Sequence, residues 1–303
     1  MGVTNYPDFS DVVLIGGTGR SGTTITGKLL SRHPEVKHSQ PTEIKFLTSG
    51  NGLIDLAKKS RFTRKGKLIL GKNAHFNRFK RDVQGKWWIR DGKKGGKTGL
   101  SRGIEETSMG ELLAFLNEEL LIDRNLACAN FMRRFVDYQL QGQEIKYWID
   151  TTPPNLMFAD EISNLMPGVR FIHLIRDGRD VASSVVRERW GPNEHSKALI
   201  WWHARLESIL RATKTMPDKV LHVWLEDLTI HDRENQLKRI LEFLNLKPAE
   251  KLSKYFETEV TAENAHTGRW RKEVANTTEF EAKYEALLQD LYGLGLPKPM
   301  KQI

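Results

Sequence analysis

The sequence has little cysteine and no long apolar run. Cys128 is the only cysteine among 303 residues, so no disulfide can form within the chain. A single free thiol is typical of proteins in a reducing compartment, and we expect a cytoplasmic protein. No run of about 18 apolar residues occurs, which predicts that no transmembrane helix is present. Residues 1–11 have neither the basic start nor the apolar stretch of a signal peptide, so none is expected.

Charge is unevenly distributed along the chain. The formal net charge is +9, with 39% hydrophobic and 28% charged residues, which is ordinary for a soluble globular protein. Residues 61–102 hold fourteen Lys or Arg against Asp82 and Asp91, so this segment carries +12 and the remainder −3. We interpret residues 61–104 as a basic insertion or flap, which is either a solvated surface or a contact for an anionic partner. Turn-forming Asp-Gly and Gly-Gly pairs within residues 87–97 predict a hairpin or ordered loop.

A glycine-rich turn between a strand and a helix lies near the start of the chain. The apolar run at 12–15 predicts a buried strand, and apolar residues at helical spacing within 25–30 predict a helix. Between them the sequence reads Gly16-Gly17-Thr18-Gly19-Arg20-Ser21-Gly22-Thr23-Thr24. Glycines allow backbone N–H groups to converge on an anion, and a helix N-terminus adds partial positive charge. The segment therefore predicts a phosphate-binding turn.

The spacing of this turn matches nucleoside-triphosphate-binding loops, but their lysine is missing. Gly17 and Gly22 are separated by four residues, as in the pattern G-x-x-x-x-G-K-[ST]. Thr23 stands where that pattern requires lysine, and Thr24 keeps the hydroxyl. Arg20 is the cation available within the turn, and its planar guanidinium suits a tetrahedral oxyanion.

Alternating strands and helices predict an α/β fold. Residues 147–150, 169–175 and 220–225 are interpreted as further buried strands. Helices are expected over residues 104–121, 125–138, 155–166, 198–213, 234–244 and 279–291, with Asn155 capping the third. This order predicts one domain over residues 1–303, built on a P-loop, doubly wound parallel sheet flanked by helices.

A second candidate anion site follows the strand at 169–175. Ligands of open parallel sheets bind at the carboxyl ends of the strands, where Arg176 is expected. Ser184 lies eight residues further on, about two helical turns away. These residues predict an anion site beside the first one; the alternative is an ordinary strand–helix turn with surface arginines. His173, inside the strand, is interpreted as a core histidine rather than a ligand.

Two other segments carry candidate residues. Residues 266–272 contain three cations and Trp270, and such a loop can close over a planar, anionic ligand. Glu43 lies among apolar residues shortly after the first turn, where a carboxylate could face a bound ligand. Taken alone, Glu43 is read as an exposed or helix-capping carboxylate.

Together, these segments resemble the sulfotransferases that use 3′-phosphoadenylyl sulfate. Residues 17–24 look like the family's 5′-phosphosulfate loop, in the style of the carbohydrate and protein-tyrosine enzymes. The run R-D-G-R-D-V-A-S-S from Arg176 matches the 3′-phosphate motif, and residues 268–272 are similar to the C-terminal G-x-W-[KR] loop. Residues 42–46 resemble the K-E-V-H-F-F region of heparan sulfotransferases, in which Glu is the catalytic base. The resemblance covers residues 12–47, 147–190 and 266–272.

This resemblance implies a donor and a set of site residues. Glu43 would be the general base, and Arg20 would stabilise the transferring group. The implied donor-binding residues are Gly19, Arg20, Ser21, Gly22, Thr23, Thr24, Arg176, Ser184, Arg269, Trp270 and Arg271. The donor would be 3′-phosphoadenylyl sulfate (PAPS), the product 3′,5′-adenosine bisphosphate (PAP), and the acceptor a hydroxyl or amine, sugar-like or anionic. No metal ion and no nucleic acid partner are expected, and the sequence has no clustered metal-ligand motif.

Two positions depart from the family pattern. Thr151 stands where the heparan enzymes have the lysine of K-[ST]-P, so Arg20, Lys45 or a lysine of the basic insertion would take over its role. Leu225 replaces the tyrosine of the Y-E-D motif near the adenine, so any adenine contact there would be apolar. The alternatives are a P-loop kinase, which would need ATP and Mg²⁺, and a non-catalytic polyanion binder.

Overall fold

The computed structural model describes residues 6–58, 74–92 and 95–301. In chain order the elements are β1 (Val12–Gly17), α1 (Thr23–Leu30), β2 (Val36–His38), α2 (Leu53–Lys58), α3 (Ala74–Gln84), β3 (Arg90–Asp91), β4 (Lys97–Thr98), η1 (Leu100–Arg102), α4 (Glu106–Glu119), α5 (Arg124–Leu140), β5 (Tyr147–Asp150), η2 (Pro153–Phe158), α6 (Ala159–Leu165), β6 (Arg170–Ile175), α7 (Gly178–Val185), α8 (His195–Thr213), η3 (Pro217–Lys219), β7 (Val220–Trp224), η4 (Asp227–His231), α9 (Arg233–Phe243), α10 (Glu250–Glu259), α11 (Ala262–Ala265), α12 (Trp270–Glu273) and α13 (Thr277–Gly293).

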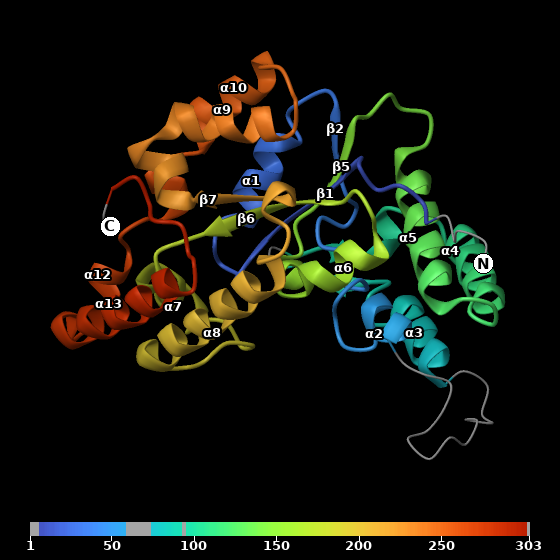
Figure 1. Ribbon diagram of the computed structural model, residues 1–303, viewed down its shortest axis with the longest axis horizontal. Helices are drawn as coiled ribbons and strands as arrows, with labels where there is room; N and C mark the ends of the chain where they lie inside the picture. The colour runs from blue at the N-terminus through green and yellow to red at the C-terminus, as the bar shows by residue number, and fades with distance from the viewer. Residues whose placement is uncertain (1–5, 59–73, 93–94, 302–303) are drawn as a thin grey trace. The chain divides into compact units, whose positions relative to one another are not determined.

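The main sheet has five parallel strands in the order β2-β5-β1-β6-β7, with helices flanking it (Figure 1). The predicted α/β class is therefore confirmed. Every residue of β1 and β5 is buried, as expected for apolar strands of a parallel sheet. In the β6–β7 pair, Phe171 lies opposite Val220 and Ile175 opposite Trp224, so both strands end together beside Arg176.

The chain divides into two compact units, each described by itself. Unit 1 comprises residues 1–13, 37–152 and 161–169. Unit 2 comprises residues 14–36, 153–160 and 170–303. Within the described residues, no helix is both long and apolar enough to cross a membrane.

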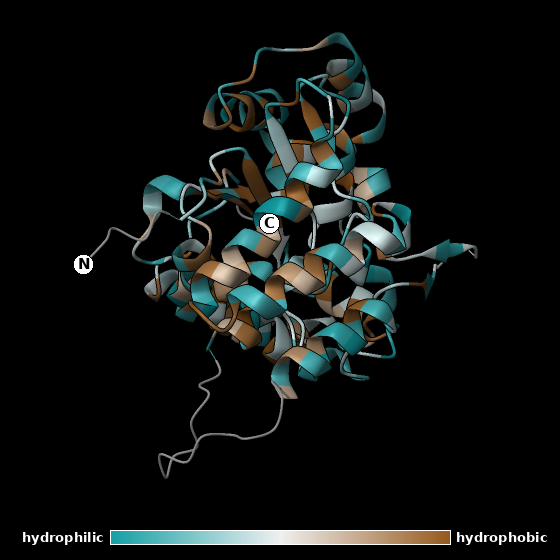
Figure 2. Cartoon of the chain, turned by 90° about the vertical axis from the view of Figure 1, so that its right-hand side faces the viewer, coloured by the Kyte–Doolittle hydropathy of each residue, from teal (hydrophilic) through white to brown (hydrophobic). Residues whose placement is uncertain are grey.

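Unit 1 is built around an aromatic cluster. Phe46 packs edge to face against Phe79, Phe131 and Phe135, with ring centroids 4.9–6.3 Å apart. Helices α4 and α5 pack against each other, and α4 buries Met109, Leu112, Leu113 and Leu116 on one side. The alternation of apolar and polar segments along such helices is visible in Figure 2. Burial of this apolar stripe is what the helical spacing of residues 104–121 predicts.

The predicted hairpin at 87–97 is confirmed, because β3 and β4 pair antiparallel with Arg90 opposite Thr98. Part of the basic segment 61–104, residues 61–73 and 93–94, lies outside the described residues. The proposal that the whole segment forms an insertion or flap stays a prediction.

Unit 2 packs its helices around a second core. Trp202 of α8 and Tyr284 of α13 are fully buried, with ring centroids 5.6 Å apart. Trp270 joins the same cluster through Phe280, at 6.1 Å. This core supports the turn between β6 and α7, because a Cβ on Gly178 would lie 2.7 Å from the Trp202 ring.

The prediction for Asn155 is wrong, and the prediction for His173 is confirmed. Asn155 does not cap a helix: it lies inside η2, and α6 begins only at Ala159. His173 is a core histidine as predicted, fully buried, with Nδ1 2.9 Å from Nδ1 of His222. Burial lowers the pKa of His173 well below its ordinary value and the pKa of His222 to about 4, so both rings are neutral at neutral pH.

Candidate functional site

The predicted phosphate-binding turn, residues 17–24 of unit 2, is tightly curled. Gly19, Arg20 and Gly22 have φ values of 93°, 61° and 95°, in the left-handed region that glycine adopts without strain. A Cβ on Gly17 would lie 2.4 Å from the carbonyl oxygen of Leu174 and from Ser21 Oγ, so only glycine fits there. Arg20 is not glycine, and a left-handed arginine is a mark of functional sites.

Several residues of this turn carry hydroxyl groups. Ser21 is fully buried, and its Oγ has no hydrogen-bond partner in the part of the chain that the structure describes. Thr23 is buried and Thr24 exposed at the start of α1, where the helix N-terminus favours an anion. Buried donors without partners are costly, so this arrangement fits an anionic group that accepts from them.

Arg20 and Ser184, two predicted site residues 164 positions apart, are in contact. Arg20 Nε donates to Ser184 Oγ at 2.7 Å. Arg20 Nη1 also lies 3.5 Å from Glu188 Oε1, and the Arg20 side chain is 41% exposed. The turn after β1 and the helix after β6 therefore meet at this hydrogen bond, so the two predicted anion sites adjoin each other.

Arg176 holds the backbone of this site together. Its Nη1 donates to the carbonyl of Arg20 at 3.0 Å, and its Nη2 donates to the carbonyls of Ala265 and His266 at 2.9 and 3.0 Å. Its Nε is buried and has no partner among the residues described. Arg176 thus joins the predicted phosphate-binding turn to the C-terminal loop, with one N–H donor left without a partner among the described residues.

The C-terminal loop is tied down by a carboxylate that the sequence analysis missed. Asp180 accepts from the backbone N–H of Gly268 at 2.7 Å and of Trp270 at 3.2 Å. Asp180 Oδ2 also lies 3.7 Å from Nη2 of Arg176, which precedes it by four residues. That four-residue spacing, which pairs charges on a helix, was the available signal.

The three predicted residues of this loop have different environments. Trp270 is 1% exposed, with the guanidinium groups of Arg179 and Arg271 4.5 and 4.8 Å from its ring. Arg269 is ion-paired with Glu273. Trp270 therefore anchors the loop in the core, and Arg269 and Arg271 are its more accessible cations.

A buried carboxyl lies beneath the β6–α7 turn. Glu226 Oε1 accepts from the backbone N–H of Asp177 at 3.0 Å, and Asp177 forms a buried ion pair with Arg179 at 2.7 Å. Burial, helped by the charge of Asp177, raises the pKa of Glu226 to about 8. Glu226 is therefore largely protonated at neutral pH. The sequence analysis considered its neighbour Leu225 and overlooked Glu226.

In unit 1, Glu43 lies on a loop held at both of its neighbours. Thr151 donates to the carbonyl of Thr42 through its backbone N–H at 3.0 Å and its hydroxyl at 2.8 Å. Asp150 accepts from the backbone N–H of Ile44 at 3.0 Å. The Glu43 side chain, 32% exposed, is ion-paired with Lys45.

The residues at the end of β5 hold the loop around Glu43 in place. Asp150 is fully buried, and burial together with the charge of Glu43 raises its pKa to about 6. The Thr151 hydroxyl donates its proton to the carbonyl of Thr42, so its Oγ1 can only accept from a second partner. The neutral ring of His38 is therefore the donor to Thr151 Oγ1, at 3.2 Å. The threonine that replaces the expected lysine is thus a structural anchor for the Glu43 loop.

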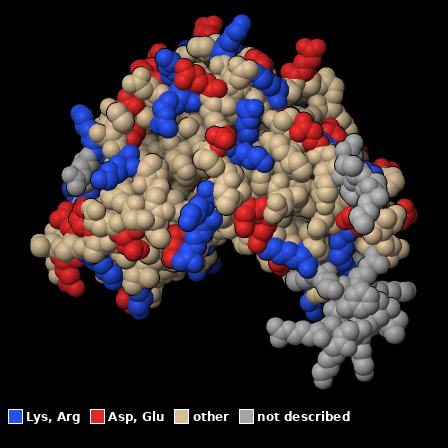
Figure 3. All heavy atoms as spheres, viewed as in Figure 1, with Lys and Arg blue, Asp and Glu red and all other residues tan. Residues whose placement is uncertain are grey.

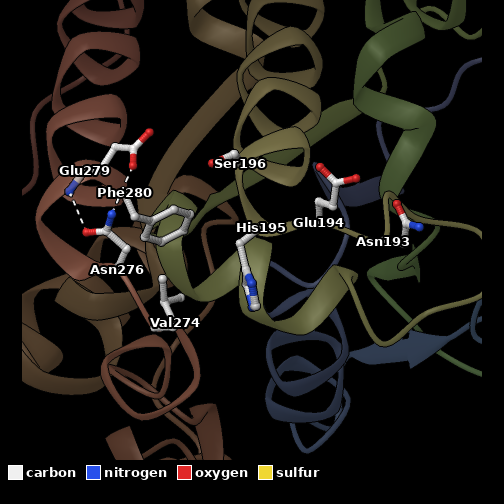
Figure 4. Close-up of a pocket in the computed structure, with 9 residues that line it drawn as sticks. Asn193, Glu194, His195, Ser196, Val274, Asn276, Glu279 and Phe280 are labelled. Atoms are coloured by element: carbon white, nitrogen blue, oxygen red, sulfur yellow. Dashed lines mark hydrogen bonds between the residues drawn. The ribbon is translucent and has the colours of Figure 1, made fainter.

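Other surface features do not coincide with the predicted site. A hollow of about 370 Å³ lies between the starts of α8 and α13, where Phe280 and Val274 point toward His195 (Figure 4). None of the predicted site residues lines it. On the face drawn in Figure 3, Lys and Arg side chains are interspersed with acidic ones, so the described residues of that face form no uniform basic surface.

The chain is similar in sequence to known proteins over most of its length. A family model described as "Sulfotransferase family" matches residues 12–250. Protein-tyrosine sulfotransferase 1 of Danio rerio is 22% identical over 240 residues, covering 78% of this chain and 53% of that protein. Protein-tyrosine sulfotransferase A of Caenorhabditis elegans is 21% identical over 248 residues, covering 80% and 51%. The chain spans about half the length of these curated relatives.

A solved structure shares the fold. The sulfotransferase domain of the olefin synthase of Synechococcus PCC 7002 superimposes with a TM-score of 0.54 at 18% sequence identity. The match covers 99% of both chains. At this level of identity, the likeness concerns the fold alone.

Proposed function

Since the chain belongs to the sulfotransferase family, we propose that it transfers a sulfuryl group from PAPS to a hydroxyl or amine of an acceptor. The observation that carries the proposal is the contact of Arg20 with Ser184, next to Ser21 in the turn, whose buried hydroxyl has no partner among the described residues. A cationic turn next to a second anion site suits a donor with phosphate groups at both ends of its ribose.

Residues of unit 2 are proposed to bind this donor. The backbone of Gly19 and Gly22, with the hydroxyls of Ser21, Thr23 and Thr24, would hold the 5′-phosphosulfate. The residues that would select the 3′-phosphate are Arg176, Ser184, Arg269 and Arg271, with Trp270 fixing their loop. The free Arg176 Nε and Ser21 Oγ support this assignment, because an anion would satisfy both.

The chemistry requires positioning and electrostatic stabilisation. PAPS supplies an activated sulfuryl group, whose transfer resembles phosphoryl transfer: the bond from sulfur to the acceptor oxygen forms as the bond to the phosphate oxygen breaks. Arg20 would stabilise the charge that develops on the leaving phosphate. Glu43 would accept the proton of the acceptor hydroxyl, and Lys45 beside it is a candidate for the role of the missing lysine. A metal ion is not required by this scheme, since the transferred group carries less charge than a phosphoryl group.

Hydroxyl-bearing acceptors are proposed first, because both curated relatives are named for tyrosine, whose side chain is a phenol. A sugar-like acceptor remains an alternative suggested by the basic segment. A kinase would instead require a lysine where Thr23 stands.

Thermal denaturation tests the proposal directly. PAP is expected to raise the melting temperature with the logarithm of its concentration once that concentration exceeds the dissociation constant, and ATP with Mg²⁺ to raise it far less. The control is adenosine 5′-phosphate, which lacks the 3′-phosphate and should bind more weakly than PAP. A larger shift with ATP and Mg²⁺ than with PAP would favour the kinase and overturn the proposal.

A further inference from the structure

An exposed tryptophan stands against the phosphate-binding turn in unit 2. Trp190, in the turn after α7, is 54% exposed. An ideal Cβ on Gly19 would lie 3.7 Å from Cη2 of Trp190 and 3.8 Å from Cη2 of Trp201, so both ring tips lie near Gly19. A large aromatic ring left half-exposed beside a binding turn is a candidate recognition surface.

Trp201 lies beside the Trp190 ring and is itself held by Arg205. The Trp190 and Trp201 centroids lie 5.8 Å apart at 44°. The Arg205 guanidinium lies 4.2 Å from the Trp201 centroid and donates to the carbonyl of Thr18 at 3.3 Å. Trp201 is therefore fixed between a cation and Trp190, and it supports the exposed ring.

The backbone also fixes Trp190. A Cβ on Gly191 would lie 2.4 Å from Val185 Cγ1, so this close turn needs glycine. Glu188, two residues before Trp190, lies 3.5 Å from Arg20. The turn that carries Trp190 is thus tied to the residue proposed to stabilise the transferring group.

The donor's adenine is expected near Leu225. A Cβ on Gly22 would lie 2.7 Å from Leu225 Cδ1, so Leu225, the residue at the adenine-side motif, packs against Gly22. Trp190 and Trp201 pack against Gly19 instead. Trp190 and the residue expected near the adenine therefore adjoin different glycines of the turn.

Building on the proposed function, we propose that Trp190 is a stacking surface for the aromatic ring of a phenolic acceptor, with Trp201 as its support. Aromatic pairs in offset or edge-to-face contact contribute beyond the area they bury, and tryptophan offers the largest ring. Stacking here would place the acceptor ring beside the turn proposed to hold the sulfuryl donor.

Steady-state kinetics of Trp190→Ala test this assignment with PAPS as donor. With 2-naphthol as acceptor, KM is expected to rise about tenfold, the change that corresponds to about 1.4 kcal/mol of lost stacking. With cyclohexanol, whose ring is not aromatic, KM should change less than about twofold. Trp190→Phe should restore most of the affinity for 2-naphthol, and Ile200→Ala, at a neighbouring 51% exposed side chain, should leave KM unchanged.

A binding measurement keeps the proposal testable if turnover is slow. Calorimetry with the enzyme–PAP complex should detect 2-naphthol in the unaltered protein and in Ile200→Ala, and lose it in Trp190→Ala. A PAP affinity that falls as much as the naphthol affinity would place the adenine on Trp190 and overturn the proposal, as would equal effects of Trp190→Ala and Ile200→Ala. Absence of PAP binding by the unaltered protein would instead overturn the proposed function.

Discussion

Two loops carry the proposed chemistry, and they are held in different ways. The turn at residues 17–24 in unit 2 depends on its own backbone: glycines at left-handed positions, and a carbonyl bound by Arg176. The loop around Glu43 in unit 1 depends on side chains of a distant strand, Asp150 and Thr151. The first loop is proposed to bind an anion through its backbone, whereas the second holds one carboxylate by contacts of other residues.

This difference predicts two kinds of defect. Changes in the turn at residues 17–24 should weaken donor binding and transfer together. Changes at Glu43 should slow transfer and leave donor binding intact, because Glu43 is not one of the residues proposed to bind the donor. The following variants test that separation, beginning with the largest expected effect.

Arg20→Ala should cause the largest loss. Removing a donor that stabilises developing charge lowers kcat by about 10²–10³, and loss of a charged hydrogen bond lowers donor affinity by about tenfold more. We therefore expect kcat/KM for PAPS to fall by about 10³–10⁴. Steady-state kinetics at varied PAPS concentration measure both parts.

The matched control for Arg20 is Arg211→Ala on α8, an exposed arginine that is paired with Glu207. It should change kcat/KM by less than about twofold, as surface substitutions do. Arg20→Lys, which keeps the charge and loses the planar fork, should fall between the two. A kcat within a few-fold of the unaltered protein for Arg20→Ala would contradict the role given to this residue.

Glu43→Gln should lower kcat by about 10²–10⁴, the range of general base catalysis, while the Kd for PAP stays within about twofold. The glutamine keeps the shape of the side chain and cannot accept the proton. Kinetics and calorimetry with PAP measure the two quantities. Glu106→Gln, an exposed carboxylate at the start of α4, is the control and should leave both unchanged.

Near-normal turnover of Glu43→Gln would remove Glu43 as the base. A loss of PAP affinity as large as the loss of kcat would show instead that the loop around Glu43 supports donor binding. That result would erase the contrast between the two loops.

The sequence predicted the turn better than the Glu43 loop, for a physical reason. Gly17, Gly22 and Arg20 define their turn over a few residues, so the information is local. The anchors of Glu43 are more than a hundred residues away at Asp150 and Thr151, and the sequence reading of Thr151 was only that a lysine was missing. The strand order that brings β5 to this loop is a property of the fold.

The same limit applied inside unit 2. Arg176 and Ser184 were found by their motif, but the carbonyl groups that Arg176 binds at Ala265 and His266 lie 89 and 90 residues further on. Trp190 was not singled out, because nothing in the local sequence shows that its ring reaches Gly19. Glu226 was overlooked because a carboxylate after a strand is usually exposed, whereas this one is fully buried.

Glu226 provides the smallest expected effect, a change in the pH dependence of stability. Its pKa rises from 4.5 to about 8 on folding, so the folded state binds this proton more tightly than the unfolded chain. The stabilisation is fully present below pH 4.5 and is lost as the pH rises to about 8. Glu226→Gln, which imitates the protonated carboxyl, should remove this loss.

Melting temperatures between pH 5 and pH 8 measure the effect. The unaltered protein should lose more stability over this range than Glu226→Gln, by a difference on the order of a few degrees. Asp150, whose pKa rises to about 6, loses stabilisation over the lower part of the same range, but it does so in both proteins and cancels in the comparison.

Glu234→Gln, an exposed carboxylate in the first turn of α9, is the control and should keep the slope of the unaltered protein. Parallel curves for Glu226→Gln and the unaltered protein would mean that Glu226 is ionised in the folded state. In that case Glu226, which accepts a hydrogen bond from the backbone N–H of Asp177, would be a second buried negative charge at the β6–α7 turn. It would lie beside the ion pair of Asp177 with Arg179.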